Sequence, residues 1–380
     1  MGAVLKKKKP LILFVLVFIV LNAGLYQPVY ANDSPEPDLT SEAFILMDSS
    51  TGKILYEENS RKPMYPASIT KILTAIIAIE THGLNELVTV SSKAVEADGT
   101  RVYLLEGEQM TLAQLLQGLM VSSGNDAAIA IAEHIDGSVA AFAERMNRFA
   151  EKRIGVTTSN FTNPHGLFEE EHITTALDMA KISAYAMKNK AFRELVSTEY
   201  VDWVGEGWET QLYNHHPLLR NQEHVIGIKN GYVQPSGYTL STAAKIGSTE
   251  LITVTLNSPS RYNAEKDTLA LLEYGFDNYE TKWIDFAGEP LLANFIYPDA
   301  APVTVKKGEP MHYNISEQGF VTIYNDEKHT LNVIELEERQ RINLPKYVFL
   351  LEPEANHAEK NENGFFSWLD WFIITGFHFL

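Results

Sequence analysis

The stretch Pro66-Ala67-Ser68-Ile69-Thr70-Lys71 places a serine and a lysine one helical turn apart. A serine hydroxyl is a weak nucleophile and needs a base within hydrogen-bond reach. Positions i and i+3 of a helix lie on one face, so Lys71 can sit beside Ser68. Apolar residues repeat at helical spacing up to His82-Gly83, which predicts a helix that begins near Ser68. The alternative interpretation is a capping serine followed by a surface lysine.

The same spacing of serine and lysine occurs a second time, at Ser50-Thr51-Gly52-Lys53. Here Thr51-Gly52 separates two apolar runs, Ala43 to Met47 and Ile54 to Tyr56. Short apolar runs divided by a glycine-containing turn are typical of a β-hairpin. The spacing alone is therefore weak evidence, and this second occurrence is interpreted as a turn.

A polar interruption between two apolar helical patterns is the second informative stretch. Leucines from 112 to 119 form a helical stripe, Val121-Ser122-Ser123-Gly124-Asn125-Asp126 breaks it, and a helix resumes from Ala127 to Ile135. A loop between two buried helices can project Ser123 and Asn125 into a cleft. The alternative is that these side chains only cap the second helix.

The third stretch, Ile226 to Val233, has the pattern of a strand and contains Lys229-Asn230-Gly231. Its glycines would allow a ligand to approach the backbone closely. A lysine at this point is a suitable partner for a substrate carboxylate. The alternative is a solvated lysine followed by an Asn-Gly turn.

Together the three stretches resemble the serine D-alanyl-D-alanine carboxypeptidases, which are low-molecular-mass penicillin-binding proteins of the DD-peptidase and serine β-lactamase superfamily. The resemblance covers about Glu42 to Phe276. Further matching stretches are Thr162-Asn163-Pro164-His165-Gly166-Leu167, Thr174 to Ala180 and Asn214 to Leu219. The chain departs from the family at Asn230, where the usual residue is Thr or Ser. It also shows no Glu-x-x-x-Asn segment of the kind that class A β-lactamases use for deacylation, since Glu169, Glu170 and Glu171 are followed by His172 and Ile173.

The resemblance implies a role for each matching residue. Ser68 would be the nucleophile that attacks the penultimate D-alanine of a peptidoglycan stem peptide, with Lys71 as the general base and Ser123 as the proton relay. The backbone of Ser68 and Tyr232 would form the oxyanion hole. Substrate binding would fall to Asn125, Lys229, Asn230 and Gly231. β-Lactam antibiotics would be inhibitors, and neither a metal nor an organic cofactor is implied.

The pattern of elements predicts an α+β fold: an antiparallel sheet of the β-lactamase and DD-peptidase type with a helical subdomain, followed by a small β-rich domain. Strand patterns occur near both ends of the first domain, with helical patterns between them. The predicted segments are a signal peptide (1–31), a linker (32–41), a catalytic domain (42–276), the β-rich domain (277–352), a second linker (353–363) and a C-terminal helix (364–380).

The N-terminus has the features of an export signal. Lys6 to Lys9 are basic, Leu11 to Leu21 are apolar, and Val29-Tyr30-Ala31 is a cleavage site. The alternative is an uncleaved anchor, although the apolar run is short for a membrane span. We therefore expect the mature protein on the outer face of the cytoplasmic membrane, in a bacterial cell envelope.

The C-terminal segment predicts attachment to a membrane surface. Residues 364–380 are rich in Trp and Phe, and Asp370 lies with Ser367, Thr375 and His378 on one helical face. Such a helix would lie in the membrane interface with its apolar face buried. The alternative is that it packs on the protein's own core.

Composition excludes several classes of function. The net charge of −18 becomes 27 − 49 = −22 without residues 1–31, which argues against nucleic-acid binding. The absence of cysteine excludes disulfides and thiolate metal sites. The pair His215-His216 could suggest a metal site, but adjacent side chains on a strand point apart, which favours isolated surface or loop histidines.

Three hypotheses remain open from the sequence. The first is an active carboxypeptidase that trims the cell-wall precursor. The second is a weakly active or inactive penicillin- or peptidoglycan-binding homologue, because Asn230 replaces the usual hydroxyl residue. The third is a β-lactamase, which the missing deacylation segment disfavours.

Overall fold

The computed structural model describes residues 35–286 and 294–338. The predicted signal peptide, second linker and C-terminal helix lie outside the described residues. The chain divides into two units, 1–338 and 339–380, and the description below concerns the first. Within the described ranges, no helix is both long enough and apolar enough to span a membrane.

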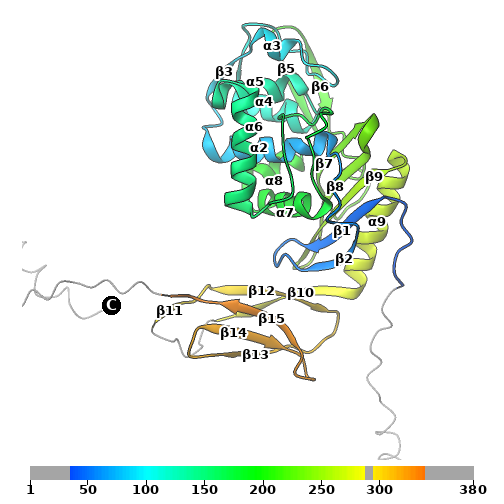
Figure 1. The fold of residues 1–380 in the computed structure, drawn as a ribbon, viewed down its shortest axis with the longest axis vertical. Helices are drawn as coiled ribbons and strands as arrows, with labels where there is room; N and C mark the ends of the chain where they lie inside the picture. The colour runs from blue at the N-terminus through cyan, green and yellow to red at the C-terminus, as the bar shows by residue number, and fades with distance from the viewer. Residues whose placement is uncertain (1–34, 287–293, 339–380) are drawn as a thin grey trace, which may run out of the picture. The chain divides into compact units, whose positions relative to one another are not determined.

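The first unit is built around a five-stranded antiparallel sheet in the order β2-β1-β9-β8-β7 (Figure 1). Its strands are β1 (Ala43–Asp48), β2 (Ile54–Glu58), β7 (Val225–Val233), β8 (Gly237–Ile246) and β9 (Thr249–Ser258). The pairing of β1 with β9 joins segments about two hundred residues apart, as the predicted α+β fold requires. The turn between β1 and β2 contains Gly52 at φ 71°, which confirms the predicted hairpin.

The two faces of this sheet carry separate apolar cores. Along β1, Ala43, Ile45 and Met47 belong to one core, and Phe44 and Leu46 belong to the other. This alternation follows from the period of two along a strand. Helix α9 (Arg261–Asn278) packs on the second face against β8 and β9, while α7 (Ala176–Met187) packs on the first face (Figure 1). The sheet is thus covered on both sides by helices.

The helical subdomain lies between β2 and β7 in the sequence. Its helices are α2 (Lys71–Thr81), α3 (Ser92–Val95), α4 (Leu112–Met120), α5 (Asn125–Asp136), α6 (Val139–Phe149), α7 (Ala176–Met187) and α8 (Lys190–Val196), with the short turns η1 (Ala67–Thr70) and η2 (Ala150–Ile154). The subdomain also contains two small antiparallel pairs of strands. One consists of β3 (Leu87–Thr89) and β4 (Gln109–Thr111), and the other of β5 (Tyr200–Val204) and β6 (Glu209–Tyr213).

The residues after α9 form strands, as their alternating pattern predicted. These strands are β10 (Tyr279–Asp285), β11 (Phe295–Ile296), β12 (Ala300–Lys306), β13 (His312–Ile315), β14 (Phe320–Tyr324), β15 (Thr330–Glu335) and β16 (Glu337–Glu338). They share an apolar core of their own that includes Val303, Val305 and Val321. The domain boundaries proposed from the sequence stay predictions.

Candidate active site

Ser68 lies on a tight turn that holds its hydroxyl beside Lys71. The turn is the 3₁₀ helix η1, and α2 begins only at Lys71, three residues later than the start predicted near Ser68. In a 3₁₀ helix, side chains at i and i+3 eclipse each other. The distance from Lys71 Nζ to Ser68 Oγ is 3.0 Å, as the spacing predicted.

The backbone around Ser68 is strained. Ala67 has a φ of 49°, a left-handed conformation that non-glycine residues rarely adopt. Gly166 packs closely against the same turn, since a Cβ atom at position 166 would lie 1.9 Å from the Ala67 carbonyl oxygen. Backbone strain of this kind is characteristic of functional sites. Only glycine at position 166 permits this approach.

The Lys71 side chain is fully buried and surrounded by hydrogen-bond acceptors. Besides Ser68 Oγ, Nζ lies 2.7 Å from Asn125 Oδ1 and 2.8 Å from the carbonyl oxygen of His165. Burial, together with the charge of Lys229, holds the pKa of the Lys71 amine well below its usual range. A neutral amine is the form that can accept a proton from serine.

The second stretch differs in part from the prediction. Asn125 is the first residue of α5 and not part of the loop, and its Nδ2 donates to the Asp98 carbonyl oxygen at 2.6 Å. Ser123 remains in the loop, buried, with a φ of 65°. Among the described residues, the Ser123 hydroxyl forms no hydrogen bond with Lys71 or Lys229. The structure therefore bonds Asn125 directly to Lys71, but not Ser123.

Asp126 follows Asn125 directly, and the sequence motifs predicted no role for it in the site. Its carboxylate is inaccessible to solvent and accepts hydrogen bonds from the backbone N–H groups of Val102, Leu104 and Ala127 at 2.9–3.2 Å. It thereby fastens the 102–104 segment to the start of α5, next to Asn125. A carboxylate suits this position because it only accepts hydrogen bonds.

We expect Asp126→Asn to lower the free energy of unfolding by about 2 kcal/mol, because an amide nitrogen would face buried N–H donors. Chemical denaturation of the variant and the parent measures the difference. Asp202→Asn is the matched control, since Asp202 is exposed and its carboxylate accepts one hydrogen bond among the described residues, from the Gln211 side chain. Equal stability of both variants would contradict the role given to Asp126.

Lys229 lies in the middle of the edge strand β7, and its side chain is buried. Asn230 and Gly231 pair with Leu240 and Thr239 of β8, which excludes the alternative of an Asn-Gly turn. Lys229 Nζ donates to the Asn230 carbonyl oxygen at 3.0 Å and lies 3.3 Å from Asn230 Oδ1. Burial lowers the pKa of Lys229 to about 7.

Gly231 brings β7 against the serine-bearing turn. A Cβ atom on Gly231 would lie 2.6 Å from the Ser68 backbone nitrogen and 2.7 Å from Thr239 Oγ1. Thr239 Oγ1 in turn donates to the Pro66 carbonyl oxygen at 2.9 Å. The backbone N–H of Ser68 therefore lies close to the backbone at Gly231, which directly precedes Tyr232. The Tyr232 side chain itself is exposed.

His172 is a second residue that sequence reasoning missed. Its Nδ1 lies 3.0 Å from the backbone N–H of Thr162, which leaves the proton on Nε2 to be donated to Thr70 Oγ1 at 2.8 Å. Burial lowers the pKa of His172 to about 4, so the ring is neutral near pH 7. His172 therefore stabilises η1 through Thr70, which lies between Ser68 and Lys71 in the sequence.

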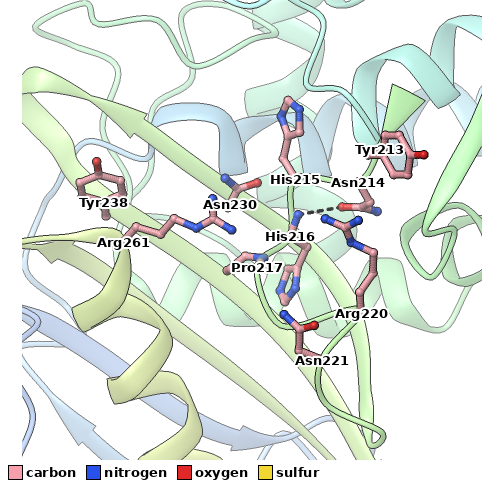
Figure 2. Close-up of a pocket in the computed structure, with 10 residues that line it drawn as sticks. All are labelled: Tyr213, Asn214, His215, His216, Pro217, Arg220, Asn221, Asn230, Tyr238 and Arg261. Carbon is pink, nitrogen blue, oxygen red and sulfur yellow. Dashed lines mark hydrogen bonds between the residues drawn. The ribbon is translucent and has the colours of Figure 1, made fainter. Parts of the chain in front are cut away.

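A cavity of about 500 Å³ opens beside Asn230 and is also lined by Arg261, the first residue of α9 (Figure 2). No sequence motif distinguished this arginine. His216 also lines the cavity; it lies in a loop, as one of the two interpretations allowed, and it is buried with Nε2 3.0 Å from Thr242 Oγ1. The described residues include no cluster of His, Cys, Asp and Glu that could hold a metal ion.

This fold, with a buried lysine beside a serine and a second lysine on the edge strand, is typical of serine acyl-transfer enzymes. The D-alanyl-D-alanine carboxypeptidase family of peptidases matches residues 30–260, and the chain belongs to this family. The family predicted from the motifs is thereby confirmed.

Individual relatives agree with this assignment. The chain is 30% identical to the D-alanyl-D-alanine carboxypeptidase DacF of Bacillus subtilis, over 80% of this chain and 77% of that protein. It is 32% identical to DacC of Escherichia coli, over 76% and 72% of the two chains. Penicillin binding protein 5 from Haemophilus influenzae superposes with a TM-score of 0.70 at 27% identity, covering 80% of this chain and 98% of that chain. This structural match confirms the predicted fold class.

Proposed function

We infer that the chain is a serine-type carboxypeptidase that removes the terminal D-alanine from peptidoglycan stem peptides and is acylated by β-lactams. The observation that carries this function is the arrangement of three hydrogen-bond partners around Lys71 Nζ. Family membership supports the same reaction.

The partners of Lys71 fit an amine that acts as a base. A neutral amine has two N–H donors and one lone pair. Asn125 Oδ1 and the His165 carbonyl oxygen can only accept, so they take both donors. The lone pair is then left for Ser68, whose hydroxyl can donate to it. This is the geometry required to remove the serine proton.

The proposed reaction has two halves. Ser68 Oγ forms a bond to the carbonyl carbon of the penultimate D-alanine while its proton moves to Lys71. The resulting oxyanion faces the backbone N–H groups of Ser68 and Tyr232, which are worth a few kcal/mol each in such sites. The amide C–N bond then breaks, and the proton passes through Ser123 to the departing D-alanine. Water hydrolyses the acyl-enzyme and restores Ser68.

Charge at the other end of the site would hold the substrate carboxylate. The proposal gives this role to Lys229 and Asn230, with Gly231 allowing the peptide to lie close to β7. Arg261 adds a second cation beside Asn230. The local positive charge matters because the chain as a whole is acidic.

The test is steady-state release of D-alanine from an acylated peptide that ends in D-Ala-D-Ala, with a fluorescent penicillin to detect the acyl-enzyme. Release together with slow loss of the penicillin label supports a carboxypeptidase. Rapid turnover of the penicillin would instead support a β-lactamase. Labelling without release would support a binding protein.

We predict a bell-shaped dependence of kcat/KM on pH. Lys71 must be neutral, so activity is lost as pH falls through its lowered pKa. Lys229 must be charged, so activity is also lost as pH rises through about 7 in the free enzyme. A bound carboxylate raises the pKa of Lys229, so the alkaline limb of kcat should lie at higher pH. In Lys229→Arg, the loss of kcat/KM near pH 7 should disappear, because arginine stays charged. If kcat/KM of this variant still falls near pH 7, the assignment to Lys229 is contradicted.

Asn230 is the residue that supports the alternative of a weakly active enzyme. Its side chain is longer than Thr and its Oδ1 already contacts Lys229 Nζ. We predict that Asn230→Thr lowers KM for the D-Ala-D-Ala peptide several-fold, because a hydroxyl donor then faces the carboxylate. Parallel measurement of kcat separates binding from chemistry. An unchanged KM would mean that Asn230 is a neutral replacement.

The proposed location is the bacterial cell envelope, where the substrate peptides are exposed. The relatives are bacterial carboxypeptidases, which supports this location. Attachment to the outer face of the cytoplasmic membrane through residues 364–380 is part of the proposal. A flotation assay with vesicles, comparing the full chain with a chain ending at residue 363, tests it.

A further inference from the structure

The cavity beside Asn230 is larger than the departing residue of the proposed reaction needs. Its volume is about 500 Å³, within the range of sites that hold ligands much larger than an alanine methyl group. Ser68, Lys71, Ser123 and Asn125 do not line it, whereas Asn230 does. Because Asn230 is placed at the carboxylate end of the substrate, the cavity lies on the side of the leaving group.

The lining of this cavity is cationic. It includes Arg220 and Arg261 and contains no acidic side chain, although the chain carries a net charge of −18 (Figure 2). Arg261 Nε is paired with Glu265 at 2.9 Å. Within the part of the chain that the structure describes, no carboxylate pairs with Arg220. The Arg220 guanidinium instead lies over the ring of Tyr213, with Cζ 5.4 Å from the ring centre.

Further polar side chains line the cavity beside Arg220. His215 and Asn221 line the cavity with Arg220, and their imidazole and amide groups can donate hydrogen bonds (Figure 2). A planar guanidinium next to neutral donors is a common arrangement for binding a carboxylate. The cavity thus offers one cation, Arg261, near Asn230 and a separate cation, Arg220.

We propose that this cavity accepts a leaving residue larger than alanine, and that Arg220 binds an acidic group on its side chain. The inference rests on the proposed function, because it uses the same amide bond cleavage. The α-carboxylate of the leaving residue lies with Lys229 and Asn230, and its side chain enters the cavity. The substrate class is therefore acyl-D-Ala-D-Xaa peptides in which Xaa has a carboxylate side chain.

The experiment compares kcat/KM of the full chain for three peptides with the same acyl part, ending in D-Ala-D-Ala, D-Ala-D-Glu and D-Ala-D-Gln. D-Gln has the size of D-Glu without the charge. We expect the parent to prefer D-Glu over D-Gln about fivefold, as for a partly exposed ion pair, and less so at high salt. Arg220→Gln should bring this ratio to about one while leaving the D-Ala-D-Ala rate within about twofold.

A matched control is Arg101→Gln. Arg101 is also exposed and lies over a tyrosine, Tyr103, at 5.3 Å, but it does not line the cavity. It should leave the D-Glu to D-Gln ratio unchanged. A parent that shows no preference for D-Glu, or a preference that survives Arg220→Gln, would overturn the inference alone. Failure to release D-alanine from the D-Ala-D-Ala peptide would overturn the proposed function as well.

Discussion

Replacing Ser68 with alanine is expected to abolish labelling by a fluorescent penicillin and to reduce D-alanine release by about four orders of magnitude or more. The reason is that no other hydroxyl occupies the position 3.0 Å from Lys71 Nζ among the described residues. Gel fluorescence measures the acyl-enzyme, and a D-alanine assay measures turnover.

The second serine–lysine pair of the chain supplies the control. Ser50 has the same spacing to Lys53 as Ser68 has to Lys71, but it lies in the turn between β1 and β2. Ser50→Ala should therefore keep full labelling and full turnover. Residual labelling of Ser68→Ala, or equal losses in both variants, would show that Ser68 is not the nucleophile.

Local spacing predicted the parts of the site that depend on neighbouring residues. The contact between Ser68 and Lys71 follows from one turn of helix, and the hairpin at Gly52 follows from turn chemistry. The antiparallel sheet also followed, because strand patterns lay on both sides of a helical middle. The family was recognised from three short motifs for the same reason: each motif is continuous in the sequence.

Contacts between residues that lie far apart in the sequence could not be predicted. The His165 carbonyl oxygen that bonds Lys71 leaves no signal in the sequence, because every residue carries such an acceptor. His172, 102 residues from Thr70, and Arg261 needed the three-dimensional fold to reach the site. The roles given to the site residues, and the two terminal segments, stay predictions.

Removing the Lys71 side chain is expected to have the second largest effect. Lys71→Ala should slow acylation by penicillin about a thousandfold, within the range of general-base catalysis. Loss of rate alone does not separate a base from a packing residue, because Lys71 is buried and touches Asn125 and the His165 carbonyl oxygen. A melting curve of the variant first establishes that it folds.

Chemical rescue separates the two roles of Lys71. The truncated side chain leaves space for a small molecule beside Ser68, and n-propylamine restores the missing amine there. We expect n-propylamine to raise the acylation rate of Lys71→Ala at least about tenfold, and rescue should increase with pH because the neutral amine is the base. n-Propanol fills the same space without a basic nitrogen and should not rescue. Equal rescue by both molecules would mean that Lys71 acts by packing, and the proton from Ser68 would then need another acceptor.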